Sequence, residues 1–281
     1  DKEITITISN QNSLKNLIEN KESYTNIQDL KIHIKVDTGL HRQGFLPEEM
    51  NGVLESLENF KNNITGLYTH FAQAKIPEDR IYTLEQIKQF KIWIEAFKHS
   101  GFSVLIHASA SGGTMIYPEA HFDMVRVGAG LYGVWPSNDI KKYLEHKYTL
   151  LPVLSWKTLI TEIKKLPAGS TIGYNLSEKI TRDSVIAICP IGYWHGFSLS
   201  LSSKGEVLVR GKRAKVLGRV CMDMIIIDVT DIQEVSYRDE VVLIGAQEKE
   251  EITIQEIAET SGTTSYEFLT RLNPLIMKLM V

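Results

Sequence analysis

The sequence has very little cysteine. Cys189 and Cys221 are the only two cysteines in 281 residues, and both lie in apolar, strand-like surroundings. So few cysteines argue against a disulfide framework and favour a reducing compartment, so we expect a cytoplasmic protein. Cys221 has no metal-ligand partner at a usable spacing, so we treat it as a packing residue, and we expect no metal site.

Long apolar runs and an excess of positive charge are also absent. No segment approaches the roughly 20 apolar residues that a membrane helix needs, so we expect no membrane partner. The 31 basic and 34 acidic residues give a net charge of −3, without a basic run that could follow a phosphate backbone. Nucleic acid is therefore not expected as a partner, whereas the 43% hydrophobic content is enough for a large buried core.

The first half of the sequence alternates strand and helix patterns. Apolar residues recur every three or four positions in the segments that we expect to be helical, and every second position in several of the strands. The expected strands are 4–9, 30–37, 64–71, 104–107 and 124–128, and the expected helices are 13–21, 47–60 and a long helix that includes 84–97. Five such units in a row predict a parallel sheet.

The second half changes to closely spaced strands separated by turn residues. We expect strands at 153–163, 184–189, 206–209, 214–219, 225–229 and 240–244, and a helix that a capping box from Thr253 to Glu256 opens. The stretch 136–147 between the halves reads as polar. The predicted organisation is therefore an α/β unit with a parallel sheet over 1–140, followed by a mostly β domain over 141–281.

Charged residues concentrate where the second predicted strand ends. Residues 30–37 alternate apolar and polar side chains, and Lys35, Asp37 and Arg42 follow one another within eight residues. The carboxyl ends of strands are the places where α/β folds carry their chemistry. This segment therefore predicts an active site.

Seven segments together resemble the alanine racemase family, in order and spacing, along essentially the whole chain. They are Lys35–Phe45, Tyr68–Ala72, His107–Ser111, Phe122–Gly128, Thr171–Tyr174, Pro190–Tyr193 and Gly218–Asp223. The resemblance implies that residues 1–140 are part of a (β/α)8 barrel, about five of its eight units, that binds pyridoxal 5′-phosphate. It also implies that a β domain follows over 141–281 and that the protein is a head-to-tail homodimer. It also implies interconversion of L-alanine and D-alanine, a small amino-acid substrate, for peptidoglycan synthesis.

The resemblance places the cofactor at the ends of the last two strands of the barrel. Loops after strands 7 and 8 often hold a phosphate, and here Ser111 would donate its hydroxyl while Gly128 lets the backbone approach. Arg126 would hydrogen-bond the pyridine nitrogen and leave it unprotonated, and His70 would orient Arg126. Each of these residues also has an ordinary structural interpretation when it is taken singly. Ser111 and Gly128 fit ordinary loop residues, Arg126 fits one partner of a surface ion pair, and His70 fits a core histidine.

The resemblance also assigns the proton transfers. Tyr174 would be one base, contributed across the dimer interface, and the lysine that holds the cofactor would be the other. A phenol with a pKa of about 10 needs a cation beside it, and Arg42 is the candidate, which would also bind the substrate carboxylate. Lys35 would help to place Arg42, because the matching lysine carries a carbamate in some relatives. The alternative is that Lys35 simply pairs with Asp37.

Three further residues would shape the substrate pocket. The Met222 amide would bind the substrate carboxylate, and Tyr193 and Tyr266 would narrow the entrance, with Tyr266 also reaching the phosphate. Tyrosine is as often a half-buried core residue as a gate. A small pocket favours alanine as the substrate, and a racemase for serine or a larger amino acid is the alternative.

The sequence departs from the family pattern at several positions. Ala110 replaces an asparagine before Ser111, Lys75 an aspartate and Leu199 an arginine, and Trp194-His195 follows Tyr193 where Ala-Asp is common.

A family motif of the type Lys-Ala-x-x-Tyr-Gly-His-Gly, which carries the cofactor lysine, is missing. With five units instead of eight, about 90 residues of a barrel are unaccounted for. We therefore expect an N-terminal segment with the attachment lysine to lie outside this chain, and the chain alone to be inactive. A non-catalytic relative of the pyridoxal-phosphate barrels is the competing hypothesis.

Overall fold

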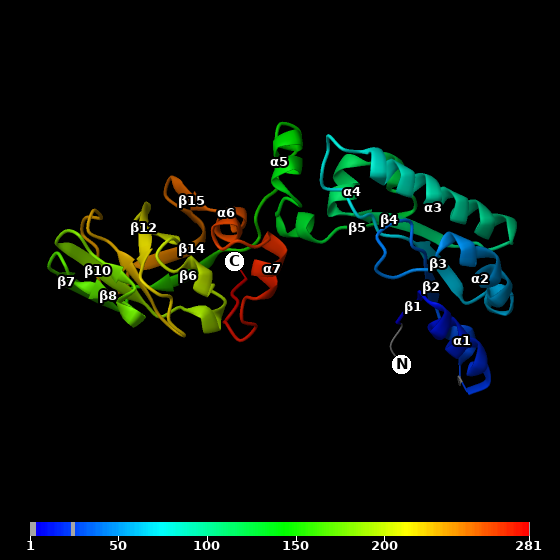
Figure 1. Cartoon of the computed structure of the whole chain (residues 1–281), viewed down its shortest axis with the longest axis horizontal. Helices are drawn as coiled ribbons and strands as arrows, with labels where there is room; N and C mark the ends of the chain where they lie inside the picture. The colour runs from blue at the N-terminus through cyan, green and yellow to red at the C-terminus, as the bar shows by residue number, and fades with distance from the viewer. Residues whose placement is uncertain (1–3, 24–25, 281) are drawn as a thin grey trace. The chain divides into compact units, whose positions relative to one another are not determined.

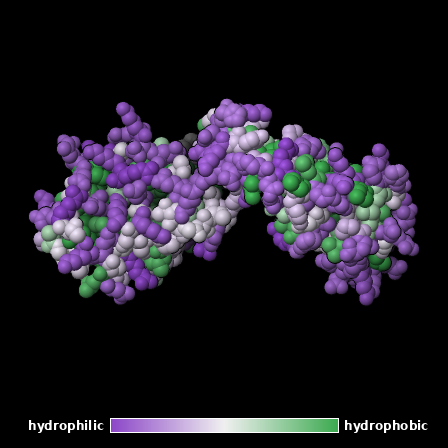
Figure 2. All heavy atoms as spheres, turned by 45° about the horizontal axis from the view of Figure 1, so that its top comes forward, coloured by the Kyte–Doolittle hydropathy of each residue, from purple (hydrophilic) through white to green (hydrophobic). Residues whose placement is uncertain are grey.

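The structure is a computed structural model that describes residues 4–23 and 26–280 (Figure 1). The chain forms two compact units, one up to residue 131 together with 135–150, the other 132–134 together with 151–281. Polar side chains cover much of the visible face of each unit, with apolar residues scattered among them (Figure 2). No helix among the described residues is long and apolar enough to cross a membrane.

The first unit is built on a five-stranded parallel sheet with the strands in chain order. Its strands are β1 (Ile6–Ile8), β2 (Ile32–Lys35), β3 (Ile64–Tyr68), β4 (Leu105–Ala110) and β5 (Met124–Arg126). Its α-helices are α1 (Gln11–Glu19), α2 (Met50–Leu57), α3 (Ile81–His99), α4 (Ser111–Ile116) and α5 (Asn138–Leu144). Short 3₁₀ helices cover 21–23, 27–29, 47–49, 58–60, 118–120 and 129–132.

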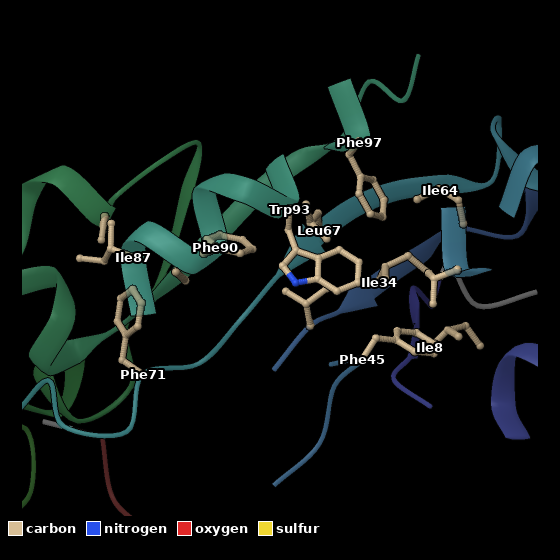
Figure 3. Close-up of a cluster of buried hydrophobic side chains, with 14 of the residues drawn as sticks. Ile8, Ile34, Phe45, Ile64, Leu67, Phe71, Ile87, Phe90, Trp93 and Phe97 are labelled. Carbon is tan, nitrogen blue, oxygen red and sulfur yellow. The ribbon is translucent and has the colours of Figure 1, made fainter. Parts of the chain in front are cut away.

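The alternation within β2 separates an apolar face of the sheet from a polar one. Ile32 and Ile34 are fully buried in the core, whereas His33 and Lys35 project to the opposite face because successive strand residues alternate. Figure 3 shows Trp93 of α3 pointing toward the strands that carry Ile34 and Leu67. The helices therefore cover the apolar face, and the polar face is left for chemistry.

Helix α5 lies across the domain boundary that we expected at residue 140. Ser137 caps it by accepting a hydrogen bond from the Ile140 N–H at 3.2 Å. Ile140 and Leu144 are buried in the core of the first unit, so the polar stretch expected here is an amphipathic helix that belongs with the barrel segment.

The second unit is mostly antiparallel β structure. An eight-stranded sheet has the order β15-β14-β11-β12-β13-β10-β7, with β6 also paired to β14, and β8 and β9 form a separate pair. The strands are β6 (Trp156–Leu159), β7 (Glu162–Leu166), β8 (Thr171–Ile172), β9 (Glu178–Lys179), β10 (Ser184–Cys189), β11 (Glu206–Val209), β12 (Lys212–Leu217), β13 (Ile225–Asp228), β14 (Glu240–Gln247) and β15 (Glu250–Ile252). Short 3₁₀ helices cover 174–176, 193–195 and 199–201.

The prediction of a single strand over 153–163 is wrong, because the segment contains two strands. The chain pairs with β14 through β6, and then the Thr161 N–H donates to the Ile188 carbonyl as β7 begins to pair with β10. The buried Ile160 lies at this change of partner. The pattern of apolar residues does not reveal such a change, because it is a property of the segment itself and not of the strand that pairs with it.

Two short helices close the second unit. Thr253 caps α6 (Ile254–Thr260) by accepting from the Glu256 N–H, as the capping box predicts. We did not predict helix α7 (Ser265–Thr270). It begins with the same kind of cap, in which the Thr264 hydroxyl accepts from the Glu267 N–H. The helix carries Tyr266.

Candidate functional site

Arg126 lies at the end of β5, and other residues of the first unit surround its guanidinium. Nη2 lies 2.7 Å from the Ala108 carbonyl oxygen, 2.9 Å from the Thr69 carbonyl oxygen and 3.1 Å from Nδ1 of His70. Nη1 donates to Nδ1 of His107. The structure therefore brings together His70 and Arg126, and it adds His107, a residue that we did not predict to belong to the site.

Both histidines that face Arg126 are held in the neutral form. Burial, followed by the positive charge of Arg126, lowers the pKa of His70 to about 4 and that of His107 to about 3. A neutral imidazole offers an unprotonated nitrogen, and a guanidinium only donates, so each histidine accepts from Arg126 through Nδ1. Burial also lowers the pKa of Arg126 itself.

Part of the guanidinium remains available to a ligand. The Nε–H group and the second Nη1–H of Arg126 have no acceptor among the described residues, whereas Nη2 is fully occupied. A fixed donor with no acceptor of its own is suited to a ring nitrogen that must remain unprotonated. The donor set at Arg126 therefore fits the pyridine end of pyridoxal 5′-phosphate.

Ser111 supplies a hydroxyl group at the neighbouring strand end. Its hydroxyl, in a side chain that is 3% exposed, accepts from the N–H groups of Gly128 at 3.0 Å and Gly130 at 3.3 Å. The hydroxyl hydrogen has no acceptor among the described residues, and a Cβ added at Gly128 would meet nothing within 4 Å. The two N–H groups orient the Ser111 hydroxyl, and its free O–H beside open space fits an oxygen of the phosphate of the same cofactor.

The segment after β2 holds the predicted substrate residues. The carboxylate of Asp37 accepts from the N–H groups of Gly39 at 2.8 Å and His41 at 3.1 Å, which shapes the loop. Lys35 Nζ lies 3.4 Å from Gln43 Oε1, and no hydrogen bond joins Lys35 to Asp37 among the described residues.

Lys35 and Arg42 are close enough to influence each other. Burial, and then the charge of Arg42, lower the pKa of the Lys35 amine, although Asp37 opposes this effect. The Arg42 side chain is exposed and has no hydrogen-bond partner among the residues described. It is therefore available to an anionic ligand.

The second unit contains a pocket of about 400 Å³ that brings three predicted residues together. Tyr174, Asn175, Tyr193, Leu199, Arg219, Val220, Cys221 and Met222 line it. Tyr266 is not among these lining residues, and burial raises its pKa. Arg219, which we did not predict to be functional, is a cation in this lining; its position in the Gly218–Asp223 motif was the available signal.

The backbone around Tyr174 is strained. Gly173, Asn175 and Leu176 have φ values of 77°, 60° and 52°, in the left-handed region that leucine rarely adopts. Strain of this kind persists where the surrounding structure over-determines it, often at functional sites. Here it presents a Tyr174 side chain that is 67% exposed.

Gly192 permits the close contact between the two other segments of the pocket. A Cβ there would lie 2.3 Å from the Cys221 carbonyl oxygen, and the Tyr193 N–H donates to that oxygen at 3.0 Å. The Met222 N–H has no acceptor among the described residues, so it is available to a ligand.

Residues at several positions that depart from the family pattern make defined contacts in the structure. His195 Nδ1 accepts from the Gly192 N–H at 3.1 Å, and the Trp194 carbonyl accepts from Asn273 at 3.0 Å, so both stabilise the turn. Ala110 pairs with Arg126 in the sheet, and burial lowers the pKa of Lys75.

Comparisons with known proteins identify the family to which both halves of the chain are similar. Residues 1–136 match the family "Alanine racemase, N-terminal domain", and residues 153–280 match "Alanine racemase, C-terminal domain". An alanine racemase of Leptospira interrogans is 39% identical over 256 residues, which are 89% of this chain and 66% of the relative. The chain thus spans about two thirds of the length of such curated relatives.

Solved structures that resemble this chain are also alanine racemases. Alanine racemase of Bacillus anthracis with bound L-Ala-P has a TM-score of 0.86 and 33% identity, covering 95% of this chain and 68% of that one. That of Bartonella henselae, with covalently bound pyridoxal phosphate, has a TM-score of 0.82 and 26% identity, covering 96% and 71%. The predicted fold class, a partial barrel followed by a mostly β domain, is confirmed. With both halves matched and such identities, the chain belongs to the alanine racemase family.

Proposed function

We propose that this chain carries the cofactor and substrate residues of a racemase that uses pyridoxal 5′-phosphate to interconvert L-alanine and D-alanine. The observation that supports it most directly is the pair of unused donors at adjacent strand ends, Arg126 on β5 and Ser111 after β4. The names of the relatives support the substrate, and the cofactor bound in the Bartonella henselae structure supports the cofactor.

The first unit would hold the cofactor. When bound, pyridoxal 5′-phosphate withdraws electron density from the α-carbon of an amino acid and makes its proton removable. Ser111 would donate its hydroxyl to the phosphate, and Gly128, which orients that hydroxyl and has no side chain, would let the phosphate approach the backbone. Arg126 would donate to the ring nitrogen and keep it unprotonated, which limits electron withdrawal and so disfavours side transamination, while neutral His70 holds Arg126 in place.

Tyr174 would move the proton on one face of the α-carbon, because racemisation requires a base on each face. A neutral phenol is a weak base, so a cation must stabilise its phenolate, and we assign Arg42 to this role and to the substrate carboxylate. The exposed position of Tyr174 is consistent with its acting in a second copy of the chain, so we propose a head-to-tail homodimer.

Lys35 would set the position of Arg42. Its lowered pKa increases the fraction of neutral amine, which is the form that reacts with carbon dioxide to give a carbamate. A carbamate would be an anionic partner for the exposed Arg42, and we propose this modification over the pairing with Asp37.

The pocket of the second unit would select the substrate. The free Met222 N–H would bind the carboxylate, and Tyr193 would narrow the entrance together with Tyr266. Such a pocket favours alanine over serine or lysine, and the product would be D-alanine for peptidoglycan. The two unpaired cysteines support a reducing compartment, and we propose the cytoplasm.

Racemisation by the complete product of the gene, supplied with pyridoxal 5′-phosphate, tests this proposal. L-alanine should become D-alanine, measured by chiral chromatography, and Arg126→Ala should reduce the rate by about 10²–10³-fold. Arg182→Ala removes an exposed arginine of the second unit and should leave the rate unchanged. Absence of alanine racemisation would contradict the proposal, and preferential turnover of serine or lysine would reassign the substrate.

A further inference from the structure

A chain of hydrogen bonds leads from Arg126 to a second histidine. His107 Nε2 lies 3.0 Å from Nδ1 of His33, while Nδ1 of His107 accepts from Arg126. His107 is on β4 and only 4% exposed, and His33 is on β2, so the two rings meet above the intervening strand β3. Their centroids are 5.1 Å apart.

Gly66 on β3 makes this contact possible. It is the register partner of His33, and a Cβ at this position would lie 2.4 Å from Cδ2 of the His33 ring. Its φ is not in the left-handed region, so the backbone alone does not require glycine there. A glycine inside a strand costs about 0.5–1 kcal/mol relative to alanine, and here it provides the space for the ring.

The neighbouring strand residue fixes the plane of the His107 ring. Tyr68 stacks on His107 with centroids 4.6 Å apart and an interplanar angle of 9°. The Tyr68 hydroxyl is in turn 3.1 Å from the Thr7 hydroxyl, and the Arg126 guanidinium lies 5.3 Å from the Tyr68 ring centroid. The His107 ring is therefore held on its face by Tyr68 and at both nitrogens by hydrogen bonds.

The direction of each hydrogen bond follows from Arg126. Because a guanidinium has no acceptor, Nδ1 of His107 must be unprotonated, and the proton of the neutral ring is on Nε2. His107 then donates through Nε2, so His33 must accept through Nδ1 and carry its own proton on Nε2. The arrangement admits a single tautomer for each ring.

We propose that His33 is a positioning residue: it accepts from the Nε2–H that Arg126 imposes on His107, holds the His107 ring in place, and thereby fixes the orientation of Arg126. Only its relevance to racemisation rests on the proposed function. His33 touches neither cofactor nor substrate in this assignment. It acts through His107, as the outer partner of a metal-ligating histidine fixes the orientation of the inner ring.

Nitrogen NMR of the chain with ¹⁵N-labelled histidine measures the tautomers directly, without cofactor. Wild-type His107 should be the pure Nε2–H form. His33→Leu removes the acceptor, so the Nε2 resonance of His107 should shift and its proton should exchange faster with water. His33→Asn, whose amide oxygen replaces Nδ1, should restore the wild-type spectrum. His99→Leu changes a histidine at the exposed end of α3 and should have no effect.

Racemisation by the complete gene product gives the second measurement. His33→Leu should lower kcat on the order of 10-fold with little change in KM, and His33→Asn should recover most of it. An Nδ1–H tautomer in wild-type His107 would overturn the proposal, even if His33→Leu did not fold. So would a His107 spectrum that His33→Leu leaves unchanged. If the wild-type protein did not racemise alanine, only the proposed function would be refuted. The positioning role of His33 would still be decided by the NMR spectrum of His107.

Discussion

Replacing Gly66 by alanine should destabilise the first unit through a single side chain. The added Cβ would lie 2.4–2.5 Å from three atoms of the His33 ring, closer than any unstrained contact. Because His33 is anchored to His107, the ring cannot move aside without breaking that hydrogen bond.

Two opposing effects set the magnitude. Gly→Ala in a strand removes conformational entropy from the unfolded chain and stabilises by about 0.5–1 kcal/mol. Overpacking a buried contact costs typically about 1–3 kcal/mol. Gly66→Ala alone should therefore range from neutral to about 2.5 kcal/mol destabilising. In a His33→Ala background the clash is gone, so the same change should stabilise, and the coupling energy should be about 1–3 kcal/mol.

Hydrogen exchange of β2 and β3 amides at increasing denaturant is the appropriate assay, because it reports on the first unit separately from the second. Gly52→Ala is the matched control. It lies in α2 with open space at its Cβ position, so alanine should stabilise by about 0.5–1 kcal/mol in either background. Equal effects of Gly66→Ala with and without the His33 ring would refute the reasoning.

Four further outcomes are expected. In the folded state the pKa of His107 is lowered from 6.5 to about 3 and that of His70 to about 4, so both rings take up protons on unfolding. The contribution of the two neutral rings to the stability of the first unit should be fully present above pH 6.5 and should be lost as the pH falls toward 4 and 3. Chemical denaturation across that pH range measures it. Ser111→Ala should weaken binding of pyridoxal 5′-phosphate about 10-fold in a fluorescence titration, and unchanged affinity would remove Ser111 from the phosphate site. Tyr174→Phe in the complete gene product should slow solvent deuterium exchange into one alanine enantiomer far more than into the other, and equal slowing would exclude its role on one face. Tyr266→Ala should raise serine and lysine turnover relative to alanine, and an unchanged ratio would show that it does not gate the pocket.

Local sequence patterns were sufficient for most of the elements. Each predicted strand of the first half has a counterpart, and the Thr253 capping box opens α6 as expected. The errors are at places where a local pattern is compatible with two structures. The segment 153–163 is rich in strand-forming residues along its whole length although it changes partner strands, and α5 has an amphipathic face within a polar stretch.

The motifs of the site were visible in the sequence, but the contacts among their residues were not. Ser111 and Gly128 are 17 positions apart and meet because adjacent parallel strands end at the same edge of the sheet. His33 belongs to an alternating strand pattern that places it on the face of Lys35, which was a signal for a polar site. That His33 reaches His107 depends on the glycine of a strand between them, 33 positions along the chain from His33.

The sequence by itself determined which elements form and which family the chain resembles, because hydrophobic period, caps and motif spacing are local properties. Tertiary structure alone decided the charge and proton positions in the site. Burial among neighbouring strand residues, followed by the charge of Arg126, lowers the pKa of His107 and of His70 and keeps both neutral. Strand order then brings their unprotonated nitrogens to Arg126. The desolvation and hydrogen-bond direction that result depend on neighbours distant in sequence, and no local pattern contains them.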